Sequence, residues 1–238
     1  MEIEINWFRA FFNFSEGINW FVASYLLIMW RCLTPPFKWL TVVFIHITLG
    51  VAFSNSVYIF FDLNNRFIAH LRTPIQFFLM SMIYYAIIES SVFRRVIVAL
   101  NIIFPIYCTL NALFIESFWF SSPTIPITIN HIAAIVFSIY FLYSIYVRSE
   151  IKYPTTNTHV ILVLSLFFYY ASTLVQEMTF NLIGYNKDLY KVYNATICFV
   201  WIIHIALILF AIRIIYKDNY GNKKNSLNVK QSEKSAFL

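Results

Sequence analysis

The residues with the clearest capacity for chemistry are polar side chains that interrupt long apolar runs. One group follows helical spacing in the run 159–180 and comprises Ser165, Tyr169, Ser172, Thr173 and Gln176, with Glu177 just beyond them. Polar groups inside a membrane are costly unless they are partnered, so they mark the first places to look for function. We therefore take this run as one wall of a candidate site.

The run 192–215 carries polar residues that would face this group. Asn194, Cys198 and Trp201 lie near one helical face, and His204 lies at its flank. We expect the two faces to meet inside a helical bundle and to form a shallow pocket near its outer side. The predicted ligand-binding residues are Gln176, Glu177, Tyr193, Asn194 and Trp201.

Two further runs carry isolated polar groups, and with the last run they give the intramembrane polar candidates His46, Asn55, Asn111 and His204. His46 also begins a stripe with Gly50 and Ser54, whose small side chains would let another helix approach closely. Two interpretations stay open for these residues. They serve a ligand or solute path, or they form ordinary interhelical hydrogen bonds worth about 0.6 kcal/mol each. For Glu177 the alternative is a position in water at the outer interface.

Several chemistries lack the residues they need. A retinal Schiff base requires a lysine within the last run, but Lys191 and Lys217 only flank it. A zinc hydrolase similar to the seven-span ceramidases needs about three converging histidines, and only His46 and His204 lie deep in apolar runs. The three cysteines show no CxxC spacing, and no hydrolase or phosphate-loop motif occurs. The sequence predicts no catalytic residue, metal or cofactor.

The composition is that of an integral membrane protein. Of 238 residues, 60% are hydrophobic and 12% are charged, which leaves too little polar surface to cover a soluble globule. The net charge of +6 resides in short loops and the tail rather than in a basic groove, so no nucleic-acid partner is expected.

The apolar runs predict an all-α bundle of seven transmembrane helices. Each run approaches the roughly 20 residues that a bilayer requires, and the runs lie at about 18–33, 39–61, 74–89, 96–115, 128–147, 159–180 and 192–215. The third begins after a polar turn at 62–72, where Thr73 suits an N-cap, Pro74 the first helical position and Gln76 a capping box. We expect an interfacial segment at 1–17, the membrane domain at 18–216 and a disordered basic tail at 217–238.

The distribution of basic residues predicts the orientation. An external amino terminus places twelve Lys and Arg inside, at Arg31, Lys38, Arg94, Arg95, Arg148, Lys152, Arg213, Lys217, Lys223, Lys224, Lys230 and Lys234. The outside then receives five, namely Arg9, Arg66, Arg72, Lys187 and Lys191. The positive-inside rule favours this arrangement, with the carboxyl terminus in the cytoplasm of a bacterial cell and the chain in the inner membrane.

Short motifs give the chain a family resemblance. They are Leu33-Thr34-Pro35-Pro36 before the second span, Thr73-Pro74-Ile75-Gln76 and Tyr84-Tyr85 in the third, and Phe168-Tyr169-Tyr170 in the sixth. In these features, and in order and length, the chain resembles a large group of uncharacterised seven-span integral membrane proteins from Bacteroidetes-type bacteria. The resemblance implies a seven-helix protein without an established activity, a sensory or signalling companion. An acidic residue often stands in that group where Gln76 stands here.

Three functions follow as hypotheses. The first is a ligand-binding or sensory module whose partners are the lipid bilayer and a membrane or cytoplasmic signalling protein, because the short tail is too small to form a catalytic domain. The second is a small-solute or lipid transporter, motivated by Pro105 and the polar faces. The third is a membrane-embedded enzyme. The ligand and the oligomeric state do not follow from the sequence.

Overall fold

The described part of the chain folds into a bundle of α-helices. A computed structural model describes residues 17–61, 65–119, 121–148, 157–183 and 195–218, with the side chains of 61, 148 and 176–183 outside that description. Its helices are Gly17–Ile28, α2 Pro35–Phe61, α3 Arg66–Ile87, α4 Ser91–Phe114, α5 Thr124–Arg148, α6 Thr158–Ile183 and Ala195–Asp218. A short 3-10 helix, η1 Trp30–Cys32, precedes α2. Within the described residues there is no strand.

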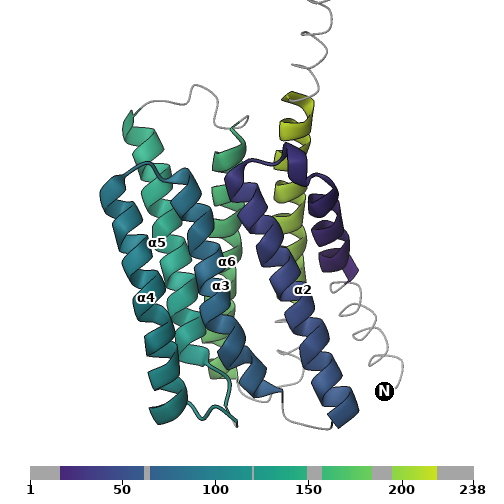
Figure 1. Cartoon of the computed structure of the whole chain (residues 1–238), viewed down its shortest axis with the longest axis vertical. Helices are drawn as coiled ribbons and strands as arrows, with labels where there is room; N and C mark the ends of the chain where they lie inside the picture. The colour runs from purple at the N-terminus through teal and green to yellow at the C-terminus, as the bar shows by residue number, and fades with distance from the viewer. Residues whose placement is uncertain (1–16, 62–64, 120, 149–156, 184–194, 219–238) are drawn as a thin grey trace, which may run out of the picture.

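The helices run up and down in a single bundle, with α3 near its centre (Figure 1). α3 packs against α2, α4 and α5, and α5 packs against α6. The interior is filled by large apolar side chains such as Phe37, Phe77, Tyr84 and Leu162, all of which are fully or almost fully buried. α3 therefore carries its side chains towards several neighbours at once, which makes it the element that organises any interior site.

Five helices are long and apolar enough to cross a membrane, with mean hydropathies of 1.7 to 2.6. They are Pro35–Phe60, Ser91–Phe114, Thr124–Val147, Thr158–Val175 and Ala195–Asp218. The helix Gly17–Ile28 is shorter, and α3 carries several polar residues in its first half. The prediction of a helical fold with several helices able to cross a membrane is confirmed for the described residues.

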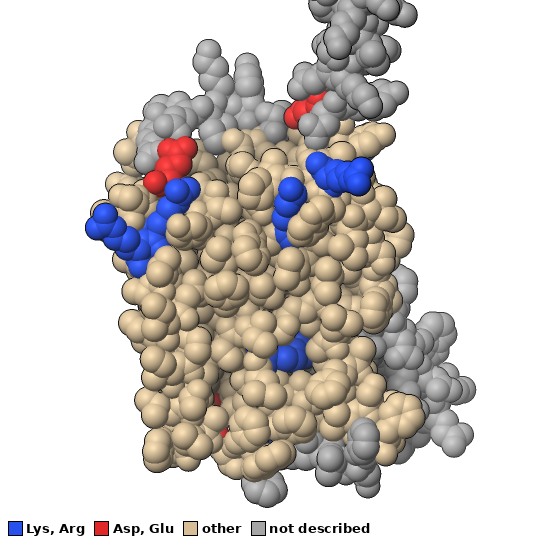
Figure 2. Space-filling model, in the orientation of Figure 1, with Lys and Arg blue, Asp and Glu red and all other residues tan. Residues whose placement is uncertain are grey.

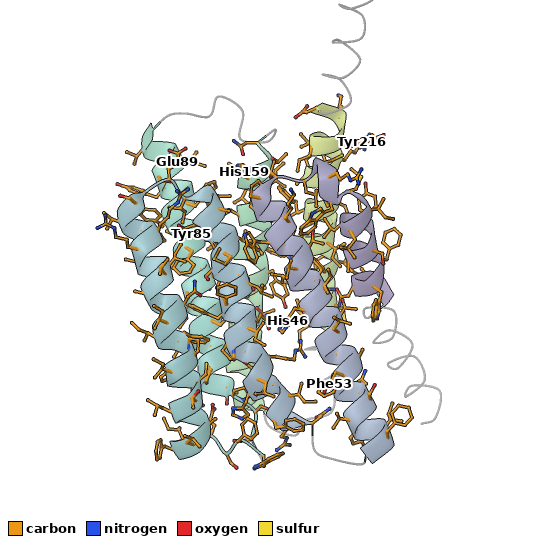
Figure 3. The ribbon with its side chains drawn as sticks, in the orientation of Figure 1. His46, Phe53, Tyr85, Glu89, His159 and Tyr216 are labelled. Atoms are coloured by element: carbon orange, nitrogen blue, oxygen red, sulfur yellow. The ribbon has the colours of Figure 1, made fainter. Side chains whose placement is uncertain are left out.

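The outer surface fits a lipid environment. Large apolar side chains such as Phe60, Ile103 and Ile139 are exposed on the outward faces of α2, α4 and α5. On the face shown in Figure 2, Lys and Arg gather towards one end, and the surface below them is almost wholly uncharged. Figure 3 places Glu89, His159 and Tyr216 at that same end, His46 near mid-height and Phe53 towards the opposite end.

The predicted start of the third helix is wrong. α3 begins at Arg66, and Asn65 occupies the N-cap position, so Arg72 and Thr73 lie within the helix rather than before it. Thr73 caps nothing, because its Oγ1 donates to the carbonyl of Ala69 at 2.8 Å. Pro74 lies inside the helix, where its missing N–H leaves the carbonyl of His70 without its usual helical partner. Arg72 therefore lies in a helix of the bundle and not in a loop.

Candidate functional site

A cavity of about 410 Å³ lies inside the bundle, between six of its helices. Its wall comes from Gly17–Ile28, from Ala195–Asp218 and from α2, α3, α5 and α6. The lining residues of α3 belong to its first half and those of α5 to its first turns, so the cavity lies towards the end of the bundle where these two helices begin. The polar part of its wall includes Asn19, Arg72, Gln76, Asn130, Tyr169 and Trp201.

Arg72 is the cation of this cavity, and the close approach of α2 to α3 fixes its place. A Cβ at Gly50 would lie 2.5 Å from the Nε of Arg72, so a larger residue at this position of α2 would displace the guanidinium group. His46, one turn earlier on α2, also lies next to Arg72. The sequence predicts that Gly50 lets a neighbouring helix approach closely. In the structure its missing side chain makes room for the guanidinium group of Arg72.

Side chains of the cavity wall hold polar atoms that are buried without a hydrogen-bond partner. Among them are the Oδ1 of Asn19, the Nε of Arg72 and the Oδ1 of Asn130. Asn130 is only 2% exposed, and none of the described residues that line the cavity is acidic. An unsatisfied buried polar group costs about 1–3 kcal/mol, so a cluster of them requires an explanation beyond packing.

Aromatic side chains form another part of the wall. The rings of Tyr169 on α6 and Trp201 on the last helix are 5.1 Å apart, and both stack near the ring of His204. The Oγ of Ser165 holds that ring through a hydrogen bond of 2.7 Å with Nδ1 of His204. This buried contact fixes the sixth and seventh helices together and orients the aromatic rings towards the cavity.

The structure tests part of the predicted site. The polar faces of the runs 159–180 and 192–215 do meet, and Trp201 lines the cavity. Tyr193 and Asn194 lie outside the described residues, as do the side chains of Gln176 and Glu177. The ligand-binding role of these five residues stays a prediction.

The intramembrane candidates fall into different positions. His204 is 3% exposed and packed among aromatic rings with Ser165 as its partner, which is a structural arrangement. Asn111 is fully buried and donates from Nδ2 to Glu116 at 2.6 Å, where it ties the end of α4 to the following loop. His46 lies beside Arg72 with its Nε2 buried and without a hydrogen-bond partner, whereas Asn55 is not among the residues that line the cavity.

Sequence reasoning missed Asn19, Arg72, Gln76 and Asn130 as site residues. For α3 a signal was present, because Ala69, Arg72, Thr73 and Gln76 recur at intervals of three to four and share one helical face. Pro74 hid this signal by suggesting a helix start. Asn19 and Asn130 stand near the ends of their helices, where no spacing separates a site residue from an interfacial one.

The described residues of the cavity present groups that can bind a molecule. No group of three or more His, Cys, Asp and Glu side chains that could hold a metal ion occurs in the described part of the chain. The Oγ of Ser165 lies in a fully buried residue and is committed to His204, so it is not presented to the cavity. Among the described residues, the cavity offers the guanidinium group of Arg72, amide groups and aromatic surface.

No protein-family model matches this sequence, and no curated protein or solved structure matches it either. The resemblance to a seven-span bacterial family therefore stays a prediction. Any functional conclusion rests on the geometry of the cavity.

Proposed function

We propose that this protein is a membrane-embedded binding module that takes a small molecule into the cavity between its helices. The supporting observation is the set of buried, unpartnered polar atoms at Asn19, Arg72 and Asn130 around one space. Ligand sites are mostly apolar concavities of about 300–1,000 Å³ with a few convergent polar groups, and this cavity has that character. A bound molecule would provide hydrogen-bond partners that the helices themselves do not provide.

The proposal includes a topology in which all seven helices cross a bacterial inner membrane. The gathering of Lys and Arg at one end of the bundle supports a cytoplasmic position for that end (Figure 2). The cavity then lies in the outer half, and the amino terminus is outside. A sensory role passes the signal to a membrane or cytoplasmic partner, for which the basic segment 217–238 is the candidate contact.

Blocking the cavity tests the proposal. Ala69 lines the cavity, so Ala69→Phe would fill part of it, whereas Ala206 is exposed on the last helix and makes Ala206→Phe the matched control. Native mass spectrometry of gently solubilised protein, together with melting in the presence of amino acids, organic acids, sugars and nucleosides, measures retained or added ligand. We expect the wild type and Ala206→Phe to bind one of these classes and Ala69→Phe to lose it. A wild-type protein that carries no small molecule and is stabilised by none of them would contradict the proposal.

A transporter is the second candidate, and Pro74 favours it. This proline interrupts the hydrogen bonding of α3 two residues after Arg72, and transporters commonly place their sites where helices are broken. Uptake of a bound solute into vesicles separates the two functions. Transport requires uptake that saturates and that Ala69→Phe abolishes, whereas a binding module binds the solute and accumulates none.

A further inference from the structure

The unpartnered atoms of the cavity have opposite polarity, and this identifies the chemistry of the ligand. The Nε–H of Arg72 is a donor without an acceptor, while the Oδ1 atoms of Asn19 and Asn130 are acceptors without donors. A simple anion would satisfy the arginine and leave both amide oxygens unpaired. A simple amine or alcohol would do the reverse.

The positive charge of Arg72 indicates that the ligand carries an acidic group. Arg72 is the only cation among the described lining residues, and no described acidic residue lines the cavity to neutralise it. A guanidinium presents a planar fork of N–H donors that matches a carboxylate, and such charge-assisted bonds are about twice as strong as neutral ones. The guanidinium group of Arg72 can therefore pair with one carboxylate of the ligand.

The apolar part of the cavity wall indicates what the rest of the ligand is. Ile47, Ile127 and Ile197 line the cavity together with the paired rings of Tyr169 and Trp201. Aromatic faces bury apolar groups and also attract cations. An apolar or aromatic side chain fits this surface, and the rings also attract an ammonium group.

We propose that the cavity binds a small organic acid that also carries a hydrogen-bond donor, of which an apolar α-amino acid is the simplest form. The inference rests on the proposed binding function and specifies its ligand class. Arg72 receives the carboxylate, Asn19 and Asn130 accept from the ammonium or hydroxyl group, and the apolar body packs against Tyr169 and Trp201.

Three related probes separate the parts of this inference. L-phenylalanine has both polar groups, 3-phenylpropionate lacks the donor and phenethylamine lacks the carboxylate. Thermal unfolding of the full-length wild-type protein in detergent, monitored by its tryptophan fluorescence, gives the apparent affinity of each probe. We expect each half-probe to bind about tenfold or more weakly than L-phenylalanine, because each leaves buried groups of the cavity unpaired.

Two pairs of variants assign the carboxylate to Arg72. Arg72→Gln should weaken L-phenylalanine about tenfold or more and leave phenethylamine unchanged, whereas Arg95→Gln, at an exposed arginine of α4, should alter neither. Gly50→Ala keeps the arginine but displaces its guanidinium and should have the same direction of effect. Gly17→Ala is the control, because nothing lies within 4 Å of a Cβ there. The gel-filtration profile of each variant reports whether it remains folded.

The outcomes separate this inference from the proposed function. Equal binding of L-phenylalanine and 3-phenylpropionate overturns the requirement for a donor, and equal binding of phenethylamine overturns the requirement for an acid. Stabilisation by a sugar or nucleoside that Ala69→Phe abolishes, with no response to the three probes, overturns the inference and leaves the binding function in place. No response to any class overturns both.

Discussion

Two sets of buried polar residues differ in how they are partnered. In the packed interior, side chains pair with each other, as Tyr84 does with Ser138 at 2.6 Å and Ser81 with Asn101 at 2.8 Å. Around the cavity, buried polar atoms of Asn19, Arg72 and Asn130 have no partner, and other buried atoms, such as the Oδ1 of Asn111 and the Nε2 of His159, also lack one. The paired set accounts for helix association, because such bonds join neighbouring helices. The unpaired atoms of Asn19, Arg72 and Asn130 belong to side chains that line one space, which is why we assign them to a ligand.

The largest effect is expected at the contact between the sixth and seventh helices. His204→Ala removes a buried ring that contacts Ser165, Tyr169 and Trp201. We expect the free energy of unfolding to fall by about 3 kcal/mol, the low end for deleting a large buried side chain. Equilibrium unfolding in mixed micelles measures it. A loss below about 0.5 kcal/mol, the level of an ordinary surface substitution, would show that this contact does not hold the bundle together.

Asn111 provides the next test of the paired set. Asn111→Leu removes the donor to Glu116, which also accepts from the hydroxyl of Thr124 and the backbone N–H of Ile125. We expect a loss of about 1–2 kcal/mol in the free energy of unfolding. Because Asn111 does not line the cavity, ligand binding or uptake should be unchanged. Abolished binding in a variant that is still folded would place Asn111 on the ligand path.

Tyr84→Phe isolates a single interhelical hydrogen bond. The substitution deletes the hydroxyl that contacts Ser138 while the buried ring stays in place. Such bonds in membrane proteins average about 0.6 kcal/mol, so we expect a loss of that size in unfolding experiments. Ser138 retains its bond to the carbonyl of Ala134, which limits the damage. A gain in stability would remove the distinction between the paired and unpaired sets.

Asn130→Leu should change stability in the opposite direction to the other three substitutions. The substitution replaces a buried amide that has an unpartnered oxygen with an apolar group of similar size. We expect the ligand-free protein to gain up to about 1 kcal/mol in the free energy of unfolding, because an unsatisfied buried group is removed. The same variant should bind L-phenylalanine more weakly than the wild type. A clear loss of stability would mean that Asn130 supports the bundle.

The sequence predicts the helices better than the cavity, and α3 shows why. Apolar runs of bilayer length place each helix to within several residues, because lipid demands continuous apolar surface and internally bonded backbone. The Thr73-Pro74-Ile75-Gln76 motif predicts a helix start from local chemistry alone. The structure continues α3 back to Arg66, because packing against α2 offsets the bond that Pro74 cannot form.

The candidate site depends on contacts between distant parts of the chain. The faces around Ser165 and His204 follow helical spacing, so their meeting could be predicted. Gly50 and Arg72 could not be paired from spacing, because the missing side chain of one makes room for the other across two helices. Asn19 and Asn130 become neighbours of the cavity only when the other four helices of its wall are in place.

The most direct test of this account is the stability of Arg72→Gln in the ligand-free state, measured by equilibrium unfolding beside the wild type. If Arg72 is kept for a ligand, removing a cation whose Nε has no partner among the described residues should leave the free energy of unfolding unchanged or raise it. A loss of more than about 1.5 kcal/mol, beyond the typical net value of one hydrogen bond, would contradict the account. Arg72 would then belong with the paired residues that hold the helices together.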